Sequence, residues 1–138
     1  MWNTPNLGLA PAVAETGFGA VGSFVAGAMN GALALRLGGE IGVATFDLFG
    51  FGSQVAANPA AFGFTDVANA CGAVSGANCS QYAYWDGIHP TTATHLAIAN
   101  AMFAATIPEP QTYALMALGL VAVAWGARRR GAKAASAA

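Results

Sequence analysis

The sequence predicts an α/β domain with a parallel sheet, followed by one C-terminal transmembrane helix. Apolar residues recur every three or four positions from about Thr16 to Leu37, as on one face of an amphipathic helix. The apolar run from Ile41 to Phe46 is typical of a buried parallel strand. A helix followed by such a strand favours α/β architecture. Residues 112–127 carry no charge and are followed directly by three arginines, which predicts the membrane helix.

Length and charge narrow the class of protein. The 138 residues fit one domain with an appendage, and the mean hydropathy is high, at +0.52. Five basic residues stand against six acidic ones, so the chain lacks the basic footprint that nucleic-acid binding requires. Four of the five basic residues lie in the last eleven positions, and Arg36 is the only one before them.

Each element of the domain has a local justification. The first helix is expected to begin at a Thr16 cap, to end at Gly38-Gly39, and to bury one apolar face. That face comprises Phe18, Val21, Val25, Met29, Leu33 and Leu37. The other expected elements are a loop over 1–15, a strand over 41–46, a helix over 48–57, a loop over 58–81 and an extended piece over 82–85.

A last helix of the domain is predicted over 91–106. Thr91 or Thr92 is its expected cap, because a threonine hydroxyl accepts from free backbone N–H groups of a first turn. The expected apolar stripe comprises Leu96, Ala99, Phe103 and Ile107.

The apolar segment 112–127 is interpreted as a membrane span. Its sixteen residues extend over roughly 24 Å as a helix, short for a bilayer core of about 30 Å unless flanking residues lengthen it. Tyr113 and Trp125 lie near its ends, where interfacial aromatics are common. The alternative is a buried core helix; the adjoining Arg128, Arg129 and Arg130 disfavour it and predict a cytoplasmic C-terminus.

Cys71 and Cys79 lie close together in a stretch rich in Gly, Ser and Asn. Their spacing alone leaves two alternatives open, a small disulfide loop in an exported protein or two reduced thiols in a cytosolic one. No metal site is expected, because the sequence lacks a CxxC pair and its histidines are not spaced as ligands with these cysteines.

Asp86 and His89 are the candidate catalytic residues. An aspartate three residues before a histidine can orient the imidazole, which then serves as general base and general acid. The missing partner is a nucleophile: none of the five serines lies in a nucleophile elbow. Ser53, which follows the predicted strand, is the nearest to one and is interpreted as structural.

A series of motifs runs through the chain in a fixed order: Asn6–Pro11 (NLGLAP), Asn58–Thr65 (NPAAFGFT), Cys71, Cys79, Tyr82, Trp85–Thr92 (WDGIHPTT) and His95. This series resembles the C-terminal part of SGNH (GDSL-type) ester hydrolases, over about residues 3–106. The resemblance implies the C-terminal portion of a flavodoxin-like three-layer sandwich with a parallel sheet, catalytic roles for Asp86 and His89, an ester or lipid substrate and no cofactor. Export, which the tail implies below, favours the Cys71–Cys79 disulfide over two reduced thiols.

The family's Gly-Asp-Ser, Gly and Gly-x-Asn-Asp blocks are not found in this sequence. We therefore expect a C-terminal portion of a hydrolase, with the serine nucleophile outside the chain and no activity for the chain alone.

The tail resembles a PEP-CTERM sorting signal. Pro108-Glu109-Pro110, the apolar helix 112–127 and Arg128–Arg130 match its three parts in order. This implies domains at 1–107 and 108–138, export in a Gram-negative bacterium, inner-membrane anchoring and processing by an exosortase-type enzyme. A plain single-pass anchor is the alternative for the tail. For the whole chain, the alternative to an exported hydrolase is a non-enzymatic surface or matrix-associated protein, a relic of one.

Overall fold

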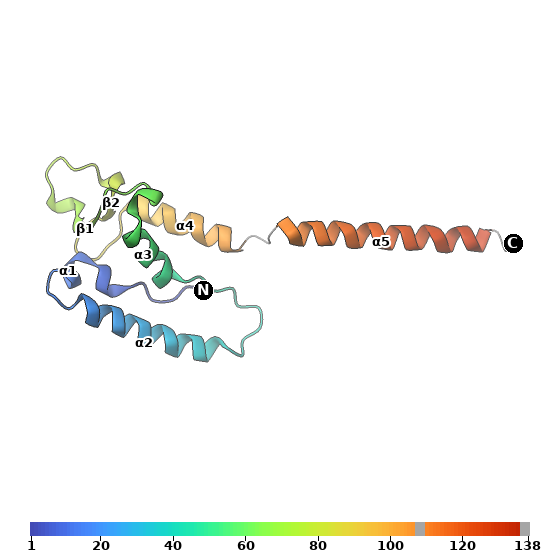
Figure 1. Ribbon diagram of the computed structural model, residues 1–138, viewed down its shortest axis with the longest axis horizontal. Coiled ribbons are helices and arrows are strands. Elements are labelled where there is room, and N and C mark those ends of the chain that lie inside the picture. Colours follow the sequence, from blue (N-terminus) through green and yellow to red (C-terminus); the bar gives the residue numbers. More distant parts are fainter. Residues whose placement is uncertain (107–109, 136–138) are drawn as a thin grey trace. The chain divides into compact units, whose positions relative to one another are not determined.

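The computed structural model describes residues 1–106 and 110–135 (Figure 1). It divides into two compact units, Met1–Ala105 and Thr106–Ala138. Ile107, Pro108 and Glu109, to which the sequence assigns part of an apolar stripe and of the sorting signal, lie outside the described residues.

Helices dominate the first unit. In chain order its elements are the 3-10 turn η1 (Leu7–Leu9), α1 (Pro11–Ala14), α2 (Gly19–Leu37), α3 (Leu48–Ala57), the 3-10 turn η2 (Pro59–Phe62), β1 (Asp66–Ala70), the 3-10 turns η3 (Cys71–Ala73) and η4 (Cys79–Gln81), β2 (Tyr82–Tyr84) and α4 (Thr92–Thr106).

The long helix α2 runs alongside the N-terminal segment, residues 1–14 (Figure 1). The contact is close because the facing residues lack side chains: a Cβ on Gly8 would collide with the carbonyl oxygen of Gly19 and with Ser23, and one on Gly22 would lie 3.0 Å from the backbone nitrogen of Gly8. Two side-chain contacts reinforce it. Ser23 Oγ donates to Asn6 Oδ1 at 2.6 Å, and Asn30 exchanges hydrogen bonds with the backbone of Thr4.

The prediction of which residues α2 buries was wrong for the first four of the six. Phe18, Val21, Val25 and Met29 are between 44% and 63% exposed, and of the predicted set only Leu33 and Leu37 are partly buried. The helix buries its small and polar side instead, with Ala26 fully buried, because small residues let two backbones approach. The expected Thr16 cap was also wrong: the helix begins at Gly19, after Phe18.

The helix α3 forms over the predicted residues, with Asp47 at its N-cap. Asp47 Oδ1 accepts from the Gly50 backbone N–H at 2.9 Å and from Asn3 Nδ2 at 2.7 Å. These two bonds hold the pKa of Asp47 below its ordinary value and join the N-terminal segment to the start of α3.

The core of the unit is small and lies under α3 and α4. Phe51, Val55 and Phe64 are buried together, and the rings of Phe51 and Phe62 meet edge to face at 5.4 Å between centroids. The predicted stripe of α4 was wrong: Leu96 and Phe103 are 62% and 68% exposed, and Ala99 is exposed. The residues of α4 that pack on this core are Ala93, Ala97, Ile98 and Ala101.

The sheet is smaller than predicted. Residues 41–46 form no regular strand and contribute one parallel bridge, between Trp2 and Phe46. The two named strands, β1 and β2, pair in parallel, with Asp66 opposite Tyr82. The strand β1 lies inside the predicted loop 58–81. The sequence did not predict this strand, because Asp and Asn are uncommon in strands.

The second unit consists of the helix α5 (Pro110–Ala135). It is longer than the predicted span 112–127, because the helix continues through the arginine cluster. Leu115, Leu118, Leu120 and Val123 are among its side chains that are more than 60% exposed within the unit.

Candidate functional site

The turn from Asp86 to Pro90 brings the two candidate catalytic side chains together. His89 Nδ1 lies 2.8 Å from Asp86 Oδ2, in a hydrogen bond between ring and carboxylate. The other carboxylate oxygen, Oδ1, accepts from the backbone N–H groups of Ile88 and His89, each at 2.7 Å. One aspartate therefore both builds the turn and orients the imidazole, while the side chain of His89 remains 73% exposed.

The hydrogen bonds to Asp86 favour its charged form. The backbone N–H of His89, the backbone N–H of Ile88 and the His89 ring together lower the pKa of Asp86 from 3.8 to about 2. The carboxylate is thus ionised across the physiological range, as an orienting partner of a general-base histidine must be.

Three backbone hydrogen bonds hold this turn, two of them from other parts of the unit. The backbone N–H of Trp85 donates to the carbonyl of His89 at 2.8 Å and closes the turn. The N–H of Gly72 donates to the carbonyl of Trp85 at 2.8 Å, and the N–H of Ala12 donates to the carbonyl of Gly87 at 2.9 Å. A Cβ on residue 87 would lie 2.8 Å from that of Ala12, so the close approach of α1 requires glycine there.

The threonine after the turn starts α4. Thr91 is buried; its Oγ1 accepts from the N–H of Thr94 at 3.2 Å and donates to the carbonyl of Tyr82 at 2.7 Å. Thr91, rather than Thr92, therefore has the capping role and also ties β2 to the helix. His95 donates its backbone N–H to the Thr91 carbonyl, and its side chain lies on an exposed part of α4.

Cys71 and Cys79 form a disulfide, with their Cα atoms 5.5 Å apart. Cys71 is buried and lies between β1 and the Gly72 contact with Trp85. The disulfide loop is therefore linked to the residue that immediately precedes Asp86.

None of the serines in the described part of the chain hydrogen-bonds His89. Ser53 Oγ donates to the carbonyl of Phe49 at 2.9 Å and accepts from Asn6 Nδ2 at 3.3 Å, and Ser23 donates to Asn6. Both hydroxyls serve the packing of α2 and α3 against the N-terminal segment. Within the same described residues, no three His, Cys, Asp or Glu side chains gather as a metal-binding group.

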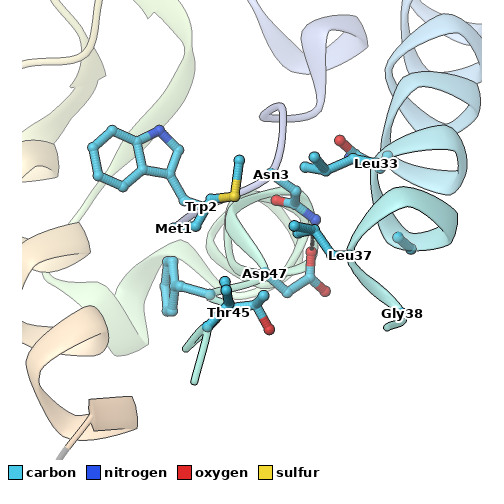
Figure 2. Close-up of a pocket in the computed structure, with 12 residues that line it drawn as sticks. Met1, Trp2, Asn3, Leu33, Leu37, Gly38, Thr45 and Asp47 are labelled. Carbon is cyan, nitrogen blue, oxygen red and sulfur yellow. Dashed lines mark hydrogen bonds between the residues drawn. The ribbon is translucent and has the colours of Figure 1, made fainter. Parts of the chain in front are cut away.

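A pocket of about 380 Å³ lies between the N-terminal residues, the end of α2 and residues 43–47 (Figure 2). Leu33 and Leu37 of α2 approach it from one side and Met1 and Trp2 from another (Figure 2). Three of its polar side chains are already paired: Asn3 bonds Asp47, as drawn in Figure 2, and Asn30 bonds the backbone of Thr4. This pocket holds neither Asp86 nor His89.

A second pocket, of about 200 Å³ and mainly apolar, adjoins the Asp86–Pro90 turn. Ile88 and Pro90, which flank His89, form part of its wall. Leu48, Val55 and Ile98 line it from α3 and α4. Such a pocket suits the apolar part of a small ligand.

The tail is the part of the chain that matches a known family model. Residues 106–130 match the PEP-CTERM protein-sorting motif. No curated protein matches the chain. The match supports export and surface sorting in a Gram-negative bacterium, with processing by an exosortase-type enzyme; it covers a small part of the chain.

One other helix has the composition of a membrane span. Among the described residues, α2 is the helix long and apolar enough to cross a bilayer, and 6% of its apolar window is buried in the unit. The apolar part of α5, Thr112–Gly126, is shorter.

The sequence singled out Asp86 and His89 but missed the contacts that hold them. The dipeptide Asp86-Gly87 is a turn signal, since aspartate accepts from backbone N–H groups two or three residues ahead. That signal was available in the sequence. The contacts from Ala12 and Gly72 join segments far apart in the chain, so no local sequence pattern predicts them.

The pKa of Asp86 predicts when the turn loosens in acid. Because the folded-state pKa lies below the ordinary value of 3.8, the stabilisation is complete above about pH 4 and is lost as the pH falls through about 2. We expect the amide resonances of Ile88 and His89 to titrate with a midpoint near pH 2 in NMR spectra of the full chain in detergent.

The matched control is Asp86→Asn, which keeps an acceptor oxygen and does not ionise, so both amide resonances should be insensitive to acid. A midpoint near 3.8 in the unsubstituted chain would show that Asp86 makes no such bonds in solution.

Proposed function

We propose that this protein is exported and held in the inner membrane of a Gram-negative bacterium by α5. An exosortase-type enzyme then processes it near Pro108-Glu109-Pro110, and the protein is sorted to the cell surface. The matched sorting motif over residues 106–130 carries this proposal. The arginines after the apolar helix remain cytoplasmic, as the positive-inside rule requires.

For the first unit we propose an origin in the C-terminal portion of an SGNH-type ester hydrolase, a flavodoxin-like three-layer sandwich. The hydrogen bond between Asp86 and His89 supports it, because a carboxylate paired with Nδ1 leaves Nε2 free to act as a base. The order of the flanking motifs supports it as well.

The apolar pocket beside the turn supports an ester with an apolar acyl group as the substrate class. Ile88 and Pro90 place the wall of this pocket next to His89 in sequence. In the complete enzyme the histidine would take the proton of a serine hydroxyl and later return a proton to the leaving alcohol. Asp86 would stabilise the imidazolium formed between these steps.

The second candidate is a non-enzymatic surface protein that retains this fold. One observation favours it for the chain as it stands: Ser23, Ser53 and Ser80 bond elsewhere, and no serine of the described residues is hydrogen-bonded to His89. Sorting through the tail needs no catalytic activity, so both candidates share the first proposal.

Processing depends on the Pro-Glu-Pro segment. In a Gram-negative host that carries an exosortase, we expect the unsubstituted chain to yield a shorter product. A Pro108→Ala, Glu109→Ala, Pro110→Ala variant should accumulate at full length in the inner-membrane fraction, as measured by immunoblotting with an N-terminal epitope tag.

Gln111→Ala is the matched control, because it changes the neighbouring residue and leaves the motif intact. Equal processing of the triple variant and the control would contradict the proposed role of the motif.

The chain alone should not hydrolyse short-chain p-nitrophenyl esters above the blank, because no serine in residues 1–106 or 110–135 is hydrogen-bonded to His89. His89→Ala should give the same baseline. Turnover that disappears in His89→Ala would contradict the prediction that the nucleophile lies outside this chain.

Translation of the DNA upstream of the Met1 codon separates the two candidates: an in-frame Gly-Asp-Ser block supports the hydrolase, and an unrelated gene there supports the surface protein.

A further inference from the structure

The two faces of α2 are inverted relative to a core helix. Its inward face, which meets the N-terminal segment, is small and polar over Gly22, Ser23, Ala26 and Asn30, and carries the half-buried Leu33 and Leu37 near the end of the helix. Its opposite face is apolar and open. We name this outward face by its exposed members: Val21, Phe24, Val25, Ala28, Ala32 and Leu35.

The outward face is continuous and uncharged. Val21, Phe24, Val25, Ala28, Ala32 and Leu35 follow one another at spacings of three or four residues or as neighbours, so they share one side of the helix. Phe24 and Leu35 are 76% and 86% exposed. The two polar side chains between Ala20 and Leu35, Ser23 and Asn30, are both engaged on the opposite face.

We propose that the outward face of α2 docks on a lipid bilayer, with the helix lying in the plane of the interface. The sequence connects this unit directly to α5, which carries most of the matched sorting motif and is the membrane anchor in the function proposed above. A tethered surface meets a lipid bilayer at high effective concentration. The inference rests on the proposed function only for this nearness of the unit to a membrane.

Composition favours lipid over a second copy of the chain. A protein interface carries polar groups at its rim, and the outward face has none until Arg36, at the end of the helix. Arg36 is exposed and can direct its guanidinium toward lipid phosphates while its stem follows the apolar face.

A spanning orientation is disfavoured by the inward face. Ser23 and Asn30 are hydrogen-bonded to the N-terminal segment, so a helix that crossed the bilayer would carry irregular backbone into the hydrocarbon region. A helix at the interface keeps these bonds and buries the opposite face.

The test uses the full chain in phosphatidylcholine vesicles, with a fluorophore attached to Phe24→Cys and the native disulfide left oxidised. Nitroxide-labelled lipids should lower its emission roughly twofold or more, as expected for a side chain buried in the acyl boundary. Ser75→Cys, on the exposed loop closed by the disulfide and drawn well away from α2 in Figure 1, is the control and should be unaffected.

A label on Ala28→Cys provides a second reading on the same face, in case the loss of Phe24 perturbs folding. Because a single cation borders the face, anionic phosphatidylglycerol vesicles should give nearly the same quenching. Iodide in the aqueous phase should quench the label at Ser75→Cys and spare those at positions 24 and 28.

Iodide quenching at positions 24 and 28, with no effect of nitroxide lipids, would overturn the proposal. Shielding from both quenchers, with self-quenching that falls as the protein is diluted in lipid, would assign the face to a second copy instead. Neither result depends on exosortase processing, so the sorting proposal stands or falls separately.

Discussion

The structure depends on the close packing of the N-terminal segment against α2. The missing side chains at Gly8 and Gly22 allow two backbones to touch, and the Asn6–Ser23 hydrogen bond fixes their register. The same segment also contacts two other parts of the unit, the start of α3 and the Asp86–Pro90 turn. Asn3 Nδ2 donates to Asp47, the N-cap residue of α3, and the backbone N–H of Ala12 donates to the carbonyl of Gly87 in that turn.

This packing explains why the apolar face of α2 is open. A helix can turn one face to its own domain, and here the glycines and hydrogen-bonding groups occupy that face. Most of the large apolar residues of α2 are consequently exposed, and Leu33 and Leu37 are the half-buried exceptions. A core helix normally buries its apolar stripe, so this arrangement indicates a second surface that the unit itself does not supply.

The sequence predicted several elements because their signals are local. The structure confirms the predicted range of α3 and nearly the whole predicted range of α4, and Asp86 and His89 were found from their spacing. The buried face of α2 was not predictable from hydrophobic periodicity, because glycine-mediated contact has no apolar signature. The prediction of the buried face of α4 was wrong for a related reason, because alanines such as Ala97, rather than Leu96, pack on the core.

The measurement that tests this account most directly compares two glycine substitutions in the full chain. Gly8→Ala should lower the free energy of unfolding by about 1–3 kcal/mol, the cost of overpacking a closed contact. Gly27→Ala, on α2 with nothing within 4 Å of its added Cβ, should raise it by about 0.5–1 kcal/mol. Urea unfolding in detergent, followed by tryptophan fluorescence, gives both values. A Gly8→Ala chain as stable as the unsubstituted one would contradict the central contact.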